Sequence, residues 1–192
     1  STLEKYDSQK MYKIYDEWAN IARESFESNQ KPINFDNIDH IVFAGMGGSG
    51  AIGDIFASVL SKTNIHVNVV KGYLLPKTVN SNSLVITVSV SGNTTETLSV
   101  LKEAYKKKSQ IIAFSSGGKM LDYCTKNKID HRLITQYHSP RGSFTSYLYT
   151  ILKILHSFLD IKYEDILESI TELEKTWNKI NSSNLTENNL SL

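Results

Sequence analysis

A cluster of glycines limits most strongly what this chain can fold into. Five of its ten glycines lie between Gly45 and Gly53, directly after the apolar run at 41–44. An apolar stripe at helical spacing follows at 52–60. A buried strand that ends in glycine and leads into a helix is typical of an α/β protein. The N–H groups at the start of such a helix have no helical partners, so an anion can bind there.

Apolar runs and amphipathic stretches alternate along the rest of the chain. We expect strands at 41–44, 66–70, 84–90, 111–114 and 131–134. We expect helices at 2–28, 52–60, 98–105, 120–127, from just after Pro140 to 155, and at 161–180. Strands that alternate with helices in this way predict an α/β fold that is doubly wound and flavodoxin-like, with a five-stranded parallel sheet flanked by helices on both faces.

Composition excludes several classes of protein. The 21 Lys and Arg residues nearly balance the 20 Asp and Glu residues, so the net charge is +1 and the basic excess of a nucleic-acid-binding protein is missing. No apolar run approaches the ~20 residues that span a bilayer, and residues 1–10 are too polar for a signal peptide. The single cysteine, Cys124, allows no disulfide within the chain. We therefore expect a cytoplasmic protein that binds neither nucleic acid nor a membrane.

Two loops carry the residue types that bind phosphate. One is Gly45–Gly50 and the other is Ser89–Thr94, and each follows a predicted strand and precedes a helix. The second loop offers hydroxyl groups at Ser89, Ser91 and Thr94. In a doubly wound sheet with strand order 2-1-3-4-5, the chain reverses direction between the first and third strands. Both loops would therefore open into the same crevice.

The composition of these loops indicates which anion fits. The first loop matches G-x-G-x-x-G, but the second strand ends at Val69-Val70-Lys71-Gly72, without the acidic residue of a dinucleotide site. No G-x-x-x-x-G-K-[ST] run occurs, so an ATP-binding loop is not supported. A pocket lined by serine and threonine suits a small phosphomonoester held by neutral donors. The alternative is that both loops are tight turns with good caps, since Asn93 and Glu96 fit an N-cap and the acid that closes it.

The two loops together resemble the sugar isomerase (SIS) domain. The matching residues are Gly47-Gly48-Ser49-Gly50 after the first strand and Ser-x-Ser-Gly-Asn-Thr-x-Glu-Thr, residues 89–97, after the third. The run Pro140-Arg141-Gly142-Ser143-Phe144 adds a similarity to one branch, the bifunctional phosphoglucose/phosphomannose isomerases. The resemblance covers about residues 10–160. Val90 stands where this family usually has an aromatic residue, which leaves the phosphate-binding hydroxyls in place.

The resemblance implies an activity and roles for particular residues. The activity is the interconversion of glucose 6-phosphate and mannose 6-phosphate with fructose 6-phosphate through a cis-enediolate, without a metal or another cofactor. Arg141 would lie near the reacting carbons, where a fixed cation stabilises the enediolate. The phosphate of the sugar would be bound by Gly47, Gly48, Ser49, Ser89, Ser91 and Thr94.

Length separates this chain from that branch, whose members carry two SIS domains. No second Ser-Gly-Asn-Thr loop follows residue 160, so the chain resembles the N-terminal half of such an enzyme. The resemblance places the glutamate base, a ring-opening histidine and a lysine in the second half. We divide the chain into an N-terminal helix at 1–30, a SIS domain at 31–160, a C-terminal helix at 161–180, and a linker or truncated start of a second SIS domain at 181–192.

No residue of this chain is a convincing catalytic base. Glu96 fits a helix cap, His138 fits a surface loop, and the histidines at 40, 66, 131 and 156 are not grouped, so we expect no metal site. Three functions stay open: half of a phosphoglucose/phosphomannose isomerase, a non-catalytic sugar-phosphate sensor, or an isomerase of another sugar phosphate. We expect a homodimer, because the helices at 2–28 and 161–180 have apolar faces that could pack on a second subunit.

Overall fold

A computed structural model describes residues 5–184 of the chain, which divide into two compact units. The sheet unit covers residues 34–136. The helical unit is built from both ends of the chain, with described residues 5–33 and 137–184. Residues 1–4 of the predicted N-terminal helix and residues 185–192 of the predicted linker lie outside the described residues.

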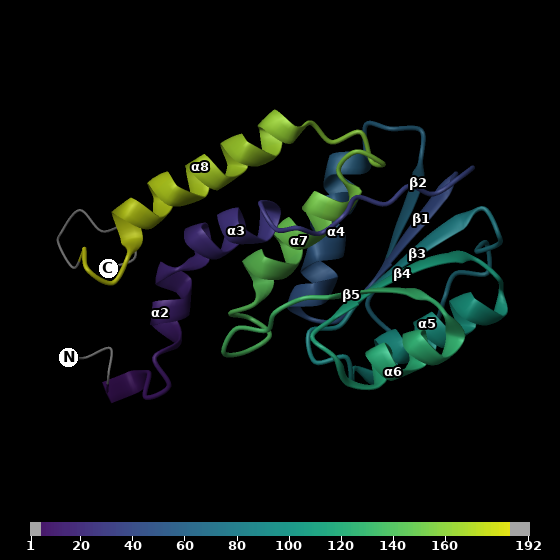
Figure 1. Ribbon diagram of the computed structural model, residues 1–192, viewed down its shortest axis with the longest axis horizontal. Coiled ribbons are helices and arrows are strands. Elements are labelled where there is room, and N and C mark those ends of the chain that lie inside the picture. Colours follow the sequence, from purple (N-terminus) through teal and green to yellow (C-terminus); the bar gives the residue numbers. More distant parts are fainter. Residues whose placement is uncertain (1–4, 185–192) are drawn as a thin grey trace. The chain divides into compact units, whose positions relative to one another are not determined.

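The sheet unit contains five parallel strands in the order β2-β1-β3-β4-β5 (Figure 1). They are β1 (His40–Ala44), β2 (His66–Val70), β3 (Ser83–Val88), β4 (Gln110–Ser115) and β5 (Asp130–Leu133). Every residue of the central strands β1 and β3 is buried, as expected for a parallel sheet covered on both faces. The predicted doubly wound, flavodoxin-like topology is confirmed, and the predicted strand ends differ from the observed ones by no more than two residues.

Helices cover both faces of this sheet (Figure 1). Helix α4 (Gly48–Leu60) packs against β1 and β2, while α5 (Thr95–Lys106) and α6 (Gly118–Asn127) pack against β3, β4 and β5. Successive side chains of a strand point to opposite faces. Accordingly Phe43 stacks on Phe56 of α4 with ring centroids 4.9 Å apart, whereas its neighbour Val42 lies in a core cluster with Val100 of α5.

The helical unit contains α2 (Met11–Asp16), α3 (Trp18–Phe26), α7 (Phe144–Leu155) and α8 (Tyr163–Ile180). The prediction of one helix at 2–28 was wrong, because the chain leaves the helical conformation at residues 7–10 and again at Glu17. After this break the Trp18 indole N–H donates to the Gly142 carbonyl at 3.0 Å. Helix α3 then packs against α7 and α8.

Helix α7 also begins later than predicted, at Phe144 rather than just after Pro140. Residues 140–143 form a turn. The hydroxyl of Ser143 stabilises this turn through contacts with the carbonyls of Tyr137 (3.1 Å) and Ser139 (2.9 Å).

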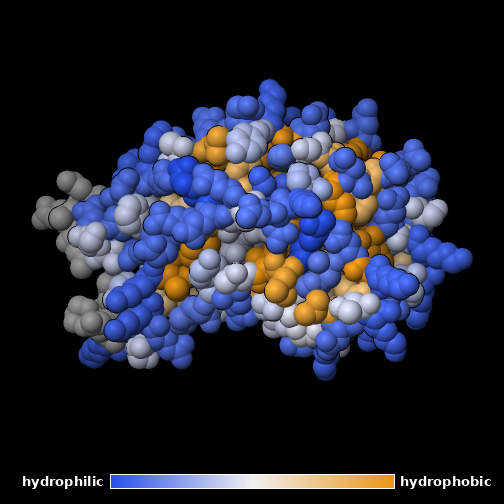
Figure 2. Space-filling view, in the orientation of Figure 1, coloured by the Kyte–Doolittle hydropathy of each residue, from blue (hydrophilic) through white to orange (hydrophobic). Residues whose placement is uncertain are grey.

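The surface of the described residues is mostly polar. Figure 2 shows hydrophilic side chains over most of the visible face, with apolar residues in separate patches. Across residues 5–184, every helix is too short or too polar to cross a membrane.

Candidate anion site at the carboxyl edge of the sheet

The first glycine-rich loop connects β1 to α4. The Gly45 N–H donates to the Val70 carbonyl of β2 at 3.1 Å, so the loop starts firmly on the sheet. Gly47 is the N-cap of α4, with φ 54° and ψ −125°. Within residues 5–184 the N–H groups of Gly47 and Gly48 have no hydrogen-bond acceptor, and both residues are exposed. Two N–H donors at the positive end of a 13-residue helix are therefore open to an anion.

The second loop, Ser89–Thr94, connects β3 to α5, and we call it the anion loop. Its Ser89 Oγ and Thr94 Oγ1 lie 2.9 Å apart, and Ser89 is buried while Thr94 is half-buried. Ser91 is exposed, and its Oγ accepts the N–H of Asn93 at 3.2 Å. Two of the three predicted hydroxyls are thus brought together, and the third forms a local turn.

The predicted cap at the start of α5 was wrong. The helix begins at Thr95 with Thr94 as its N-cap, and no side chain caps it. The Asn93 side chain instead donates to the Ser91 carbonyl at 3.0 Å and accepts the Lys119 N–H at 3.1 Å. This second partner is 26 residues away, so it competes with the cap only in the folded chain. The alternative of two merely well-capped turns loses its main support.

Strand order places the two loops at one point of the sheet. Strands β1 and β3 are hydrogen-bonded neighbours, and Ala44 at the end of β1 lies opposite Thr87 near the end of β3. Neighbouring strands are ~4.8 Å apart, so the loops start side by side at the carboxyl edge. This edge is also where the chain reverses direction between β1 and β3, which is the usual ligand-binding crevice of open α/β sheets.

A third loop, which the sequence showed only as a turn, lies against the anion loop. It connects β4 to α6 and runs from Ser115, the last residue of β4, to Gly118, the first residue of α6. The Ser116 N–H donates to the Val90 carbonyl at 3.0 Å, and the Ser116 hydroxyl donates to the same oxygen at 2.6 Å. The Ser115 hydroxyl contacts His131 Nε2 at 2.7 Å. The one sequence signal for this loop was its pair of serines and pair of glycines at the end of a strand.

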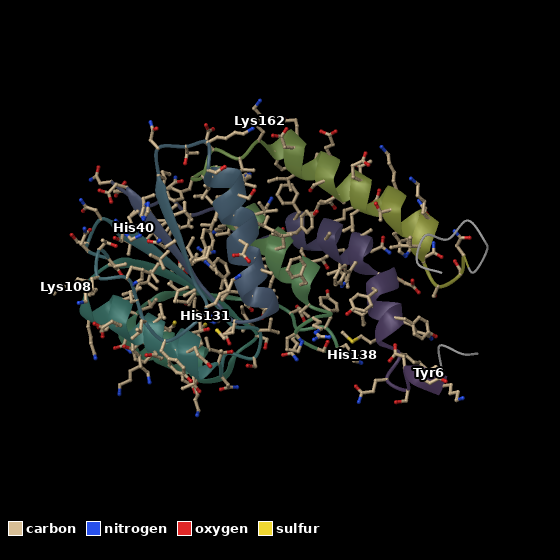
Figure 3. All side chains as sticks on the ribbon, turned by 180° about the vertical axis from the view of Figure 1, so that it is seen from behind. Tyr6, His40, Lys108, His131, His138 and Lys162 are labelled. Atoms are coloured by element: carbon tan, nitrogen blue, oxygen red, sulfur yellow. The ribbon has the colours of Figure 1, made fainter. Side chains whose placement is uncertain are left out.

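Arg141 lies in the helical unit, in the turn before α7. Its carbonyl accepts the Phe144 N–H at 3.2 Å, and the residue is exposed. Among residues 5–184 its guanidinium has no ion pair and no hydrogen-bond partner. His138, three residues earlier, contacts the Gln9 carbonyl through Nε2 at 3.1 Å (Figure 3). The role of Arg141 toward the anion loop stays a prediction.

The titratable groups of the sheet unit differ in their surroundings. Burial lowers the pKa of His131, although the neighbouring Asp130 carboxylate opposes this shift. Burial raises the pKa of the Cys124 thiol to about 11. The Glu96 carboxylate is the main cause of the raised pKa of Tyr73, so Glu96 faces a tyrosine rather than a helix cap. Asp54 pairs with Lys71 at 2.6 Å.

Two of the histidines are grouped, contrary to the prediction. The rings of His40 and His66 lie 5.0 Å apart at the amino-terminal ends of β1 and β2. His40 Nε2 is 2.8 Å from Asn68 Oδ1, and its Nδ1 is 3.3 Å from the Ser83 hydroxyl. Across the described part of the chain, no three His, Cys, Asp or Glu side chains are close enough to hold a metal ion.

Comparisons with known proteins agree with this geometry. The sequence model of the SIS domain matches residues 35–158. Bifunctional phosphoglucose/phosphomannose isomerases from Caldicellulosiruptor bescii and Thermoplasma acidophilum are 34% and 37% identical over 76% and 71% of this chain, respectively. The chain spans only 44% and 42% of their lengths.

A solved structure shares the fold at low sequence identity. It is the C-terminal domain of glucosamine-fructose-6-phosphate aminotransferase from Francisella tularensis, with a TM-score of 0.62 and 16% identity over 88% of this chain and 54% of that one. The family match covers more than half of the chain and includes both loops at the carboxyl edge of the sheet. The chain belongs to the SIS domain family.

Proposed function

We propose that this chain is the sugar-phosphate-binding half of an aldose–ketose isomerase that interconverts glucose 6-phosphate and mannose 6-phosphate with fructose 6-phosphate. The names of the curated relatives support this reaction, and the chain spans less than half of their length. The single observation that carries the proposal is the pairing of the Ser89 and Thr94 hydroxyls in the loop after β3. Strand β3 is the hydrogen-bonded neighbour of β1, whose own loop holds the open N–H groups at the start of α4. Both donor sets are neutral, which suits a phosphomonoester.

The phosphate would be bound from two sides. The N–H groups of Gly47 and Gly48, with Ser49, would contact it from the first loop. Ser89 and Thr94 would contact it from the anion loop. Ser91 is exposed on the same loop, and its hydroxyl can reach a ligand by giving up the Asn93 N–H.

Isomerisation also needs a base and a cation near the reacting carbons. Arg141 would supply the cation, since its guanidinium has no other partner within residues 5–184. The two acid–base candidates near the loops are already engaged, because Glu96 faces Tyr73 and His131 contacts Ser115. We therefore assign the base to the part of the enzyme that corresponds to the rest of the relatives' length. We also expect a cytoplasmic protein that forms a homodimer. Analytical ultracentrifugation can check the dimer.

Calorimetry with fructose 6-phosphate tests the phosphate site. Ser89→Ala and Thr94→Val each remove one hydroxyl, and each should weaken binding by ~1–3 kcal/mol, about 5- to 150-fold. Ser61→Ala is the matched control, since Ser61 lies at the other end of α4 and its hydroxyl bonds only the Ser58 carbonyl. Unchanged affinity in both loop variants would remove the anion loop from the site.

Two activity measurements test the assignment of roles. The 192-residue chain should bind the sugar phosphate without turnover, and enzyme-like isomerisation by this chain alone would contradict its role as a half. In an active two-domain enzyme that contains this chain, Arg141→Lys should lower kcat far more than it weakens substrate binding, because the charge stays while the planar guanidinium is lost. Weaker binding with unchanged kcat would make Arg141 a phosphate ligand instead.

A further inference from the structure

The loop after β4 is bound closely to the anion loop along its length. We call residues 115–119, which run from the last residue of β4 to the second residue of α6, the brace loop. Its Ser116 donates twice to the Val90 carbonyl, and the Lys119 N–H donates to Asn93 Oδ1 at 3.1 Å. Directly after it, the Met120 N–H of α6 donates to the Gly92 carbonyl at 2.9 Å. Two backbone carbonyls of the anion loop, those of Val90 and Gly92, and the side chain of Asn93 are therefore positioned from the brace side.

The backbones of the two loops also touch directly. A Cβ atom added to Gly92 would lie 1.8 Å from the Gly117 carbonyl oxygen, well inside any real contact. A Cβ atom on Gly118 would lie 2.5 Å from the Ser91 carbonyl oxygen. The anion loop therefore cannot keep its position if the brace loop moves toward it, and it loses its hydrogen bonds if the brace loop moves away.

The Ser115 hydroxyl organises the brace loop. It lies 2.8 Å from the Gly117 carbonyl, 3.2 Å from the Gly117 nitrogen and 2.7 Å from His131 Nε2. A hydroxyl has one hydrogen and two lone pairs. Because the carbonyl can only accept, Ser115 donates to it and must accept from both nitrogens. His131 therefore carries its proton on Nε2 and donates to Ser115, and the Ser115 hydroxyl is fully used.

The surroundings of this pair fit that assignment. Ser115 is fully buried, and His131 is partly buried on the edge strand β5 (Figure 3). Burial lowers the pKa of His131, which favours the neutral imidazole. The neighbouring Asp130 carboxylate is paired with Arg132 at 2.8 Å.

We propose that His131 is a positioning residue that acts through Ser115 and the brace loop to hold the anion loop in its binding geometry. This inference rests on the proposed function, because it assumes that the anion loop binds the phosphate. His131 itself would touch no ligand. Its role would be to fix the Ser115 hydroxyl, which fixes Gly117, against which Gly92 packs.

Three variants of the 192-residue chain test this role. His131→Phe keeps a ring but removes the donor, and it should weaken fructose 6-phosphate binding about tenfold, the loss of one hydrogen bond in a buried network. His131→Gln places an amide N–H donor at a similar distance along the side chain and should restore most of the affinity. His156→Phe is the matched control, since His156 is also partly buried and contacts a serine hydroxyl, but belongs to the helical unit.

Amide hydrogen exchange supplies a readout that needs no ligand. In His131→Phe, exchange should rise at Ser116 and Met120, whose N–H groups bond the anion loop, and stay unchanged at Ile86 in the centre of β3. Equal acceleration at all three amides would mean general destabilisation and would overturn the inference. Should this variant fail to fold, Ser115→Ala removes the hydroxyl that His131 contacts and should give the same faster exchange at Ser116 and Met120.

The outcomes separate the two proposals. If the unmodified chain binds no fructose 6-phosphate, the proposed function fails, while the exchange pattern still tests the brace. If the unmodified chain binds the sugar phosphate and folded His131→Phe binds it equally well, the inference fails and the proposed function stands. Weaker binding in His131→Phe that His131→Gln does not restore would also overturn the donor role of His131.

Discussion

Gly92→Ala should destabilise the chain more than any ordinary glycine substitution. Gly92 is buried with φ 68°, and the new Cβ atom would lie 1.8 Å from the Gly117 carbonyl oxygen. Real Cβ contacts stay beyond 3.0 Å, so the anion loop and the brace loop must separate by about an ångström. Because both partners of this clash are backbone atoms, no side chain can turn aside to relieve it.

The expected magnitude follows from two costs. A left-handed conformation costs an L-residue ~1–2 kcal/mol. Separation of the loops breaks the bonds from Met120 N–H to the Gly92 carbonyl and from Ser116 N–H to the Val90 carbonyl, at ~1 kcal/mol each. The free energy of unfolding should therefore fall by ~3–4 kcal/mol, a large part of the ~5–15 kcal/mol typical of a domain.

Substitutions of two other glycines separate the cost of the backbone conformation from the cost of the clash. Urea unfolding followed by circular dichroism measures the free energy of unfolding of all three variants. Gly47 has φ 54° and ψ −125° but open space around it, so Gly47→Ala should cost only the ~1–3 kcal/mol of its strained backbone conformation. Gly72 has neither a positive φ nor a close neighbour, so Gly72→Ala should be neutral or stabilising by up to ~1 kcal/mol. If Gly92→Ala costs no more than Gly47→Ala, the contact between the loops does not hold the anion loop in place.

Three further predictions follow from buried polar groups. With a pKa of about 11, the Cys124 thiol should react with iodoacetamide far more slowly in the folded chain at pH 8 than in urea; equal rates would refute its burial. The pKa values of His131 and His156 are lowered from 6.5, so the unfolded chain binds more protons and the free energy of unfolding should fall as the pH drops below about 6.5. Urea midpoints at pH 7.5 and 5.5 measure this fall, and it should shrink in His156→Phe. Thr97 Oγ1 is buried without a partner among the described residues, so Thr97→Val should raise the free energy of unfolding by ~1 kcal/mol; a clear decrease in thermal unfolding experiments would show that the hydroxyl has a partner after all.

The sheet was predictable because its signals are local. Strands β1, β3 and β4 are mostly apolar runs of five or six residues, and each is followed by a helix with its own apolar stripe. Strand β2 leads directly to β3 without a helix, and β5 is the more polar run Asp130–Leu133. Parallel strands joined by right-handed crossovers leave few possible orders, and the two loops rich in glycine and hydroxyl residues favoured the order that places them together. The break at Glu17 was not predictable, because the apolar spacing continues through it. The hydrogen bond that follows the break joins the Trp18 indole to the Gly142 carbonyl, 124 residues away in the sequence.

The sequence predicted the loops of the candidate site, but not the hydrogen bonds that hold these loops in place. Glycines and hydroxyl residues at strand ends pointed to Ser89 and Thr94 directly. The role of the Asn93 side chain was predicted wrongly, because its oxygen accepts the Lys119 N–H instead of capping α5. Only the folded sheet brings this partner near. The bond between Ser115 and His131 likewise joins two strands, and nothing in either local sequence marks it.

The composition of the helical unit from both ends of the chain has a consequence for synthesis. Helix α3 buries Ala19, Ile21 and Phe26, yet it packs against α7 and α8, which are translated more than a hundred residues later. At ~5–20 residues per second, a ribosome needs roughly 6–25 s to make the intervening chain. During that time the sheet unit can emerge complete, while the apolar face of α3 waits for its partners. Helix α3 is therefore translated before the helices on which it packs and is buried only after them, so its apolar face is open to aggregation or chaperone binding in the interval.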